Sequence, residues 1–154
     1  GAAMAGGLGM LCAGDVVVVT EDCKFALTET TLGIPPAQIA PFVAQRIGLS
    51  KARRIMLTAA RFTGKEAFEM GLADFVAKDA NDLRVIESEI KKGVMRCAPG
   101  ANAITKDIVL ATRHLSREEM IQFAAKGFAE RMLSDEGMEG IASFIEKRKP
   151  RWSK

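Results

Sequence analysis

The 154-residue sequence has no tyrosine, one tryptophan, one histidine and three cysteines. The few aromatic rings and a net charge of only +3 provide neither platforms for stacking bases nor a large basic field, so nucleic acid is not an expected partner. The apolar runs are too short for a membrane span, and a hydrophobic content of 48% argues against intrinsic disorder. The sequence therefore predicts a globular chain, either one domain or part of a larger one.

The three cysteines, Cys12, Cys23 and Cys97, cannot all pair with one another, and they show neither CxxC spacing nor a neighbouring histidine cluster. We therefore expect no metal site and a reducing, cytoplasmic location. The first residues carry no basic segment before an apolar one, so they do not resemble a secretory signal. Because the sequence also lacks an initial methionine, we expect it to be a piece of a longer protein.

The composition changes near Asp79, from a part rich in glycine and valine to one rich in helix formers. The β-branched run at residues 15–20 predicts a strand that is buried on both faces, and residues 24–27 predict a second, short strand. The adjacent Pro35 and Pro36 disfavour regular structure after it. These signals predict an α/β fold.

Further along, apolar residues recur at helical spacing, which predicts helices that each bury one stripe. The stripes run through Ala52, Ile55, Met56, Ala59 and Ala60, through Leu83, Ile86, Ile90, Val94 and Cys97, through Ile104, Ile108, Ala111 and Leu115, and through Met138, Ile141, Phe144 and Ile145. Ser116 and Glu119 have the spacing of a capping box, so we expect a helix to begin there. Ser134 is expected to cap the last helix.

A glycine-rich segment, residues 5–9, stands at the expected start of a helix. Free N–H groups and missing side chains at such a point allow an oxyanion or phosphate to approach the main chain closely. Tight packing of the helix against a sheet is the alternative, and the composition alone favours it. The GxGxxG and Walker A patterns are absent, which argues against a nucleotide site.

Glu29 lies between apolar or uncharged residues, so burial would raise its pKa and make it a candidate acid or base. A solvent-facing loop glutamate is the alternative, and the local sequence alone favours it because most glutamates are exposed. The single histidine, His114, lies near a helix end and is expected at the surface, so no Ser-His-Asp arrangement is predicted. The basic residues at 147–151 suit either phosphate binding or a helix C-terminus.

In their order and spacing, these segments resemble the enoyl-CoA hydratase/isomerase (crotonase) superfamily, from the middle of its catalytic core to its C-terminus. The matching segments are residues 1–9, 24–34, 57–73 and 137–150. The resemblance implies that residues 1–78 form the C-terminal part of a spiral of ββα turns. It also implies that residues 79–154 form a helical trimerisation region, often within a dimer of trimers.

The resemblance also implies an acyl-CoA substrate, whose coenzyme A is part of the substrate, so no separate cofactor is expected. The N–H of Gly6 matches one of two donors that hold the thioester carbonyl, and Glu29 matches a family acid/base. The second donor and much of the coenzyme A pocket belong to a preceding half that this sequence lacks. Gly7 matches a binding position, and Phe144 and Lys147 match tail positions that approach the coenzyme A of a neighbouring subunit.

The sequence departs from the family pattern at Gly9, where many hydratases have a first glutamate. This glycine and the segment at residues 35–43 resemble glutaconyl-CoA-type hydratases such as isohexenylglutaconyl-CoA hydratase. We therefore expect reversible hydration of an α,β-unsaturated acyl-CoA, with Glu29 as the remaining acid/base. An enoyl-CoA isomerase and a non-catalytic acyl-CoA or RNA-binding member of the superfamily are the alternatives.

Overall fold

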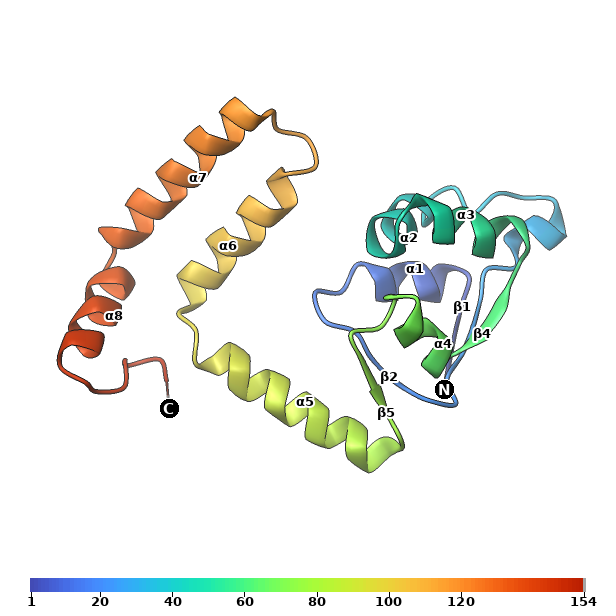
Figure 1. Ribbon diagram of the computed structural model, residues 1–154, viewed down its shortest axis with the longest axis horizontal. Helices are drawn as coiled ribbons and strands as arrows, with labels where there is room; N and C mark the ends of the chain where they lie inside the picture. The colour runs from blue at the N-terminus through green and yellow to red at the C-terminus, as the bar shows by residue number, and fades with distance from the viewer. Residues whose placement is uncertain (154) are drawn as a thin grey trace. The chain divides into compact units, whose positions relative to one another are not determined.

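The computed structural model describes residues 1–153 (Figure 1). They divide into two compact units, unit 1 from Gly1 to Glu89 and unit 2 from Ile90 onward, and the division falls within helix α5. The composition change at Asp79 thus lies at the start of this helix, and a domain boundary there stays a prediction. The mixture of helices with small sheets confirms the predicted α/β fold class.

Unit 1 contains two small sheets and four helices that precede α5. Its elements are β1 (Ala2–Met4), α1 (Gly6–Cys12), β2 (Val18–Thr20), β3 (Lys24–Ala26), the 3₁₀ turn η1 (Glu29–Leu32), α2 (Ala40–Ile47), α3 (Leu49–Leu57), β4 (Arg61–Thr63), α4 (Gly64–Glu69) and β5 (Phe75–Ala77). Helix α5 (Ala80–Met95) then leads into unit 2, which contains α6 (Pro99–Ala111), α7 (Arg117–Met132) and α8 (Asp135–Ile145).

The central sheet of unit 1 has the order β1-β3-β4, with β3 parallel to β1 and antiparallel to β4. Phe25 pairs with Phe62 across the antiparallel strands, and their rings stack with centroids 5.4 Å apart. Leu8 of α1 and Ile55 of α3 are fully buried with Phe25, so both helices contribute to one core. The predicted strand at residues 24–27 is confirmed as β3.

The valine run forms a shorter and less buried strand than predicted. Strand β2 begins at Val18 and pairs only with β5, in a two-stranded parallel sheet. Val17 and Val19 are buried, but Val16 is 46% exposed, so the prediction of a strand covered on both faces is wrong. Just before β2, the Val17 N–H donates a hydrogen bond of 2.7 Å to the Asp74 Oδ2.

Arg46, near the end of α2, connects several loops of unit 1. Its Nε donates to the Leu72 carbonyl at 2.9 Å and its Nη1 donates to the Gly14 carbonyl at 3.0 Å, while Nη2 pairs with Asp74. Helix α3 ends sooner than the apolar stripe predicted, because Ala59 has a positive φ of 46° and lies outside the helix. The backbone therefore turns at Ala59 toward β4.

The helix caps of unit 2 confirm the local predictions. The Ser116 Oγ accepts from the Glu119 N–H at 3.3 Å, and the Glu119 Oε2 accepts from the Ser116 N–H at 2.8 Å, which completes the capping box of α7. The Ser134 Oγ likewise accepts from the Gly137 N–H at 3.2 Å and caps α8. Each cap satisfies N–H groups that have no partner within the helix.

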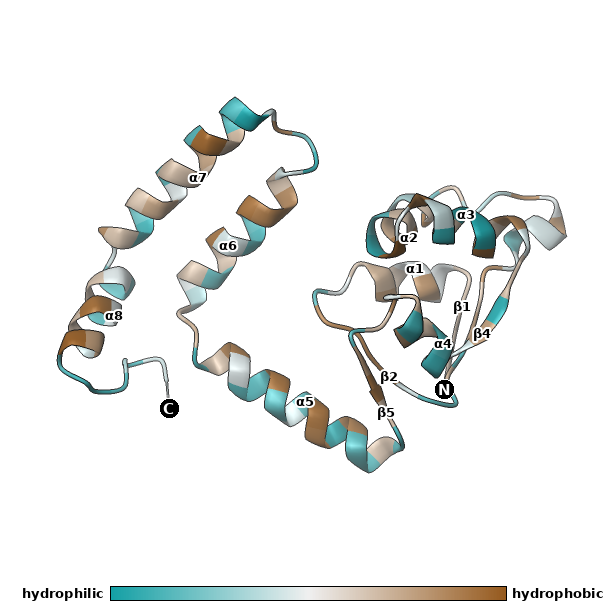
Figure 2. Ribbon diagram, viewed as in Figure 1, coloured by the Kyte–Doolittle hydropathy of each residue, from teal (hydrophilic) through white to brown (hydrophobic). Residues whose placement is uncertain are grey.

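The apolar stripe of α8 is not buried in this chain, contrary to the prediction. Met138, Ile141, Phe144 and Ile145 are all exposed, and the buried side chains of the helix are those of Glu139 and Ser143. Helix α5 has no fully buried residue. Figure 2 shows the resulting apolar segments on the helices of unit 2. None of the helices formed by residues 1–153 is both long and apolar enough to cross a membrane.

Candidate active site

The carboxyl ends of β1 and β3 bring two of the predicted segments together. The strands are parallel neighbours, and the Ala5 N–H donates to the Ala26 carbonyl at 2.9 Å just beyond the last paired residues. The turn that carries Gly6 and Gly7 follows β1 directly, and Glu29 follows β3 after two residues. These residues therefore lie at one edge of the sheet, where ligands of α/β proteins commonly bind.

The turn at Ala5 presents backbone N–H groups. Ala5 has a φ of 47° and a ψ of −121°, a strained conformation for a residue with a side chain. Its carbonyl accepts from the Leu8 and Gly9 N–H groups, so the first helical hydrogen bonds of α1 begin only after Gly6 and Gly7. A Cβ built on Gly6 would have no atom within 4 Å, so open space lies beside this backbone.

The glycines of α1 therefore differ in what they do. The packing alternative applies to Gly9, whose Cβ would overlap Ile39, and not to Gly6, which faces open space. Gly7 is intermediate, since its Cβ would make an ordinary contact of 4.0 Å with the Ala3 Cβ. The open space beside Gly6 leaves its backbone accessible, and its role as an oxyanion donor stays a prediction.

Glu29 begins the 3₁₀ turn η1, which a side chain holds against α3. The Thr30 Oγ1 donates to the Met56 carbonyl at 3.0 Å. The Glu29 side chain is half-buried, and its Oε2 is buried without a hydrogen-bond partner among residues 1–153. A buried, unpaired acceptor costs about 1–3 kcal/mol unless a ligand or water satisfies it. This environment differs from that of a solvent-facing loop glutamate, and it leaves one buried carboxylate oxygen without a hydrogen bond among residues 1–153.

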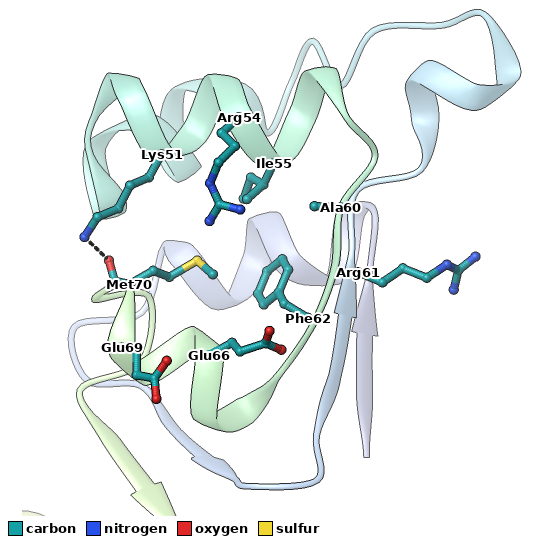
Figure 3. A pocket seen from close by; sticks show the side chains of 9 residues that line it. All are labelled: Lys51, Arg54, Ile55, Ala60, Arg61, Phe62, Glu66, Glu69 and Met70. Atoms are coloured by element: carbon teal, nitrogen blue, oxygen red, sulfur yellow. Dashed lines mark hydrogen bonds between the residues drawn. The ribbon is translucent and has the colours of Figure 1, made fainter.

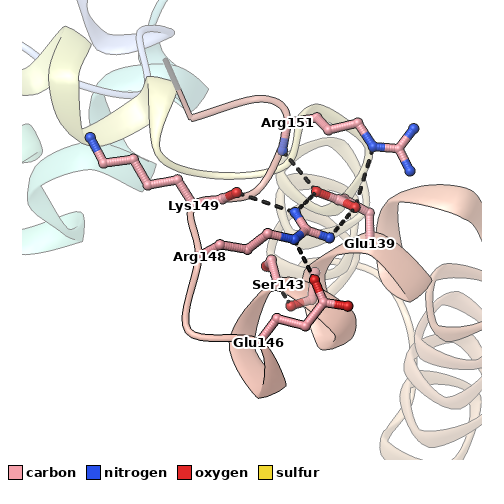
Figure 4. Close-up of polar contacts among 7 residues, drawn as sticks. Glu139, Ser143, Glu146, Arg148, Lys149 and Arg151 are labelled. Carbon is pink, nitrogen blue, oxygen red and sulfur yellow. Dashed lines mark hydrogen bonds and ion pairs between the residues drawn. The ribbon is translucent and has the colours of Figure 1, made fainter.

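The basic tail is largely committed to an internal contact that sequence reasoning missed (Figure 4). Arg148 binds Glu139 with Nη1–Oε1 and Nη2–Oε2 distances of 2.6 Å and 2.9 Å, and Arg151 binds the same carboxylate. The hydrogen bonds from Arg148 lower the pKa of Glu139 to about 2, although burial opposes them. Phosphate binding by this whole basic segment is therefore not supported. No signal in the sequence identifies the pair, because a separation of nine residues is not a helical contact spacing.

Phe144 and Lys147, the predicted tail contacts for coenzyme A, belong to unit 2. Phe144 is 84% exposed at the end of α8, and Lys147 follows with a positive φ of 54°. Both are accessible in this chain, and their roles stay predictions.

A charged pocket of about 440 Å³ lies between α3, β4 and α4, and none of the predicted site residues lines it (Figure 3). Arg54 and Glu66 point toward its middle, Arg61 points away, and the Lys51 Nζ donates to the Met70 carbonyl at 2.7 Å. Hydrogen bonds from Thr63 lower the pKa of Glu66. The pocket carries charges of both signs, so it presents no strong preference for an anion or a cation. Within residues 1–153, no group of three or more His, Cys, Asp or Glu side chains is placed to hold a metal.

Comparison with known proteins decides the family. A family model described as "Enoyl-CoA hydratase/isomerase" matches residues 1–154, the whole sequence. The chain belongs to the enoyl-CoA hydratase/isomerase family. Among curated members of the family, the chain is 31% identical over 153 residues to a protein from Bacillus subtilis named "Probable enoyl-CoA hydratase", covering 99% of the chain and 59% of that protein. It is 30% identical over 158 residues to the peroxisomal Δ(3,5)-Δ(2,4)-dienoyl-CoA isomerase of Arabidopsis thaliana, covering 100% of the chain and 56% of the isomerase.

Solved structures of the family have the same fold. The structure of AtuE from Pseudomonas aeruginosa is 47% identical, with a TM-score of 0.98, and the match covers 100% of this chain and 60% of AtuE. An enoyl-CoA hydratase/isomerase from Marinobacter aquaeolei is 39% identical with a TM-score of 0.96, covering 100% of the chain and 58% of that structure. The chain thus spans less than two thirds of the length of these relatives, among which both hydratases and isomerases are named.

Proposed function

We propose that the complete protein, meaning this chain together with any segment that precedes it, is an enoyl-CoA hydratase. The observation that carries the proposal is the Oε2 of Glu29, which is buried without a hydrogen-bond partner among residues 1–153 and lies at the same sheet edge as Gly6, whose backbone borders open space. An acid/base beside a backbone donor suits a reaction in which a proton moves while negative charge develops on a carbonyl oxygen. The family supports an acyl-CoA thioester as the substrate.

In this mechanism the Gly6 N–H donates to the thioester oxygen as the enolate forms. One such donor is worth about 3–4 kcal/mol in comparable sites. Glu29 accepts a proton from water while the water oxygen bonds to C3, and Glu29 then returns a proton to C2. The double bond is lost, one C–O and one C–H bond form, and one O–H bond of water breaks, so the atoms balance. We expect the second oxyanion donor to lie in a preceding segment, so the 154-residue chain alone should show no hydration.

For the substrate, we propose a branched glutaconyl-type CoA ester. Gly9 and the segment at residues 35–43 support this choice, because they resemble the corresponding segments of glutaconyl-CoA-type hydratases, isohexenylglutaconyl-CoA hydratase in particular. The test is kcat/KM of the complete protein for such an ester and for crotonyl-CoA. A clear preference for crotonyl-CoA would contradict the substrate and leave the hydratase activity standing.

An enoyl-CoA isomerase is the second candidate, because moving a proton between two carbons needs only one base and an enolate donor. The similarity to a dienoyl-CoA isomerase also supports it. The absorbance of the conjugated thioester distinguishes the two activities: a hydratase consumes it, and an isomerase supplied with a 3-enoyl-CoA produces it. A non-catalytic acyl-CoA or RNA-binding protein would leave this absorbance unchanged with either a conjugated enoyl-CoA or a 3-enoyl-CoA. RNA binding, if present, would weaken steeply as the salt concentration rises.

We also propose that unit 2 assembles the protein as a homotrimer or a dimer of trimers. Exposed apolar side chains on its helices support this assembly. Some of them line an apolar groove of about 300 Å³. The groove is lined by side chains that include Ile104, Ile108, Phe128, Met132 and Ile141. In such an assembly Phe144 and Lys147 would approach the coenzyme A of a neighbouring subunit. Sedimentation equilibrium of the complete protein measures the number of subunits.

The three free cysteines support a reducing compartment such as the cytoplasm.

A further inference from the structure

One contact in unit 1 explains why position 9 of α1 is a glycine. A Cβ built on Gly9 would lie 2.2 Å from the Ile39 Cγ2 and 2.5 Å from the Ile39 Cβ, far inside normal contact distance. Ile39 is β-branched and immediately precedes α2, so its Cβ is fixed by the backbone and cannot rotate away. A side chain at position 9 therefore requires the backbone around Ile39 to shift, whereas glycine does not.

The contact lies beside the proposed oxyanion donor. Gly6 and Gly9 are three residues apart in α1, so they share one face of the helix. Ile39 is half-buried and packs against the core of unit 1, where it covers the Gly9 end of this face with hydrocarbon. A water molecule next to this hydrocarbon gains no hydrogen-bond acceptor from it, whereas Glu29 has a carboxylate oxygen, Oε2, with no hydrogen-bond partner among residues 1–153.

We propose that Ile39 is a specificity-determining residue, because it fills the space that a side chain at position 9 would need and so restricts the site to one carboxylate, that of Glu29. The catalytic part of this inference, the restriction to one carboxylate, rests on the proposed hydratase function. The steric part does not, since it depends only on the packing of Gly9 against Ile39. If both parts hold, the Gly9–Ile39 pair decides whether the site has one acid/base group or two.

Thermal unfolding of the complete protein tests the steric part. In an Ile39→Gly background the nearest remaining atom to the new Cβ is the Cα of residue 39 at 3.5 Å, an ordinary contact. We expect Gly9→Ala to lower Tm by at least about 4 °C with Ile39 present and by less than half as much with Ile39→Gly. Gly7→Ala, in the same helix and with its nearest contact at 4.0 Å, is the matched control and should behave alike in both backgrounds. Equal losses for Gly9→Ala in the two backgrounds would overturn the steric part.

Hydration of crotonyl-CoA tests the catalytic part, in the double variants Gly9→Glu/Ile39→Gly and Gly9→Gln/Ile39→Gly. Glutamine matches the size of glutamate but cannot exchange a proton, so we expect kcat/KM to be at least about tenfold higher with glutamate. We also expect the pH profile to gain an ionisation that the glutamine variant lacks. Equal rates and equal profiles would overturn the specificity role. If the wild-type protein neither hydrates nor isomerises any enoyl-CoA, the proposed function fails and the catalytic part fails with it, while the unfolding experiment still decides the steric part.

Discussion

The Glu139 carboxylate in α8 accepts two hydrogen bonds from the Arg148 guanidinium, at 2.6 Å and 2.9 Å, although Glu139 is only 7% exposed. The Arg151 N–H adds a third bond of 3.0 Å to the same carboxylate. One buried acid thus holds the segment that follows α8 against that helix. A charge in such a position depends on its partners, because removal of either side leaves the other charge without compensation.

Glu139→Gln should release the tail from α8. The amide cannot match two charged hydrogen bonds, so we expect a lower Tm for unit 2 and faster trypsin cleavage after Lys147 and Arg148. Limited proteolysis with mass spectrometry measures the cleavage. Glu146→Gln is the control, because Glu146 also contacts Arg148 but is exposed. The anchoring role of Glu139 is wrong if both variants are cleaved at the same rate.

Acid should destabilise unit 2 through the same residue. The pKa of Glu139 is about 2 in the folded chain and near 4.5 ordinarily, so the unfolded state binds more protons between these values. The contribution of Glu139 to stability is therefore complete above pH 4.5 and is lost as the pH falls toward 2. Denaturant unfolding of the wild type across this range should show that loss. Glu139→Gln should show a weaker dependence on pH, and an identical dependence would contradict the assignment.

Glu29→Gln should stop catalysis without preventing binding in the complete protein. Glutamine keeps the volume but exchanges no proton, so we expect kcat for hydration to fall by at least about 100-fold. The Kd of a saturated acyl-CoA should change little, because the Gly6 N–H remains. Glu21→Gln, at an exposed position, is the matched control and should leave kcat unchanged. A fall of less than about tenfold with binding intact would show that another group carries the proton.

Cys12 should resist alkylation until unit 1 unfolds. Burial raises the pKa of its thiol to about 11, although Arg46 opposes the shift. At pH 8 the reactive thiolate is then about a thousandth of the total. Iodoacetamide should modify the exposed Cys97 in the native protein and reach Cys12 only in denaturant, as mass spectrometry of the peptides would show. A Cys23→Ser/Cys97→Ser variant leaves Cys12 as the one cysteine of the sequence, and modification of native Cys12 as fast as Cys97 would refute this prediction.

Features that depend on neighbouring residues in the sequence were predictable. The Ser116 capping box and the Ser134 cap form because each hydroxyl reaches an N–H three residues away. The helix that starts at Gly6 also follows from local composition. The partial burial of Glu29 does not, because most glutamates are exposed and the uncharged neighbours of this one only allow burial.

Features that depend on distant residues were not predictable in this way. The hydrogen bonds from Arg148 to Glu139 join positions with no characteristic spacing. The same holds for Gly9 and Ile39, which lie so close that a Cβ at position 9 would overlap Ile39. The valine run shows the same limit, because its β-branched residues predict a strand but not how many strands will cover it. Helical periodicity identifies the apolar face of α8 but not whether this chain covers it.

The pairing of β2 with β5 has a consequence for the order in which the chain folds. Asp74 accepts a hydrogen bond from a residue 57 positions earlier, and Val18 pairs with Phe75 in the adjoining ladder. Closing so long a loop costs entropy before any contact compensates for it, which slows folding. During synthesis, β2 can therefore pair with β5 only after β5 has left the ribosome. The helices of unit 2, which pack on their neighbours in sequence, need no such delay.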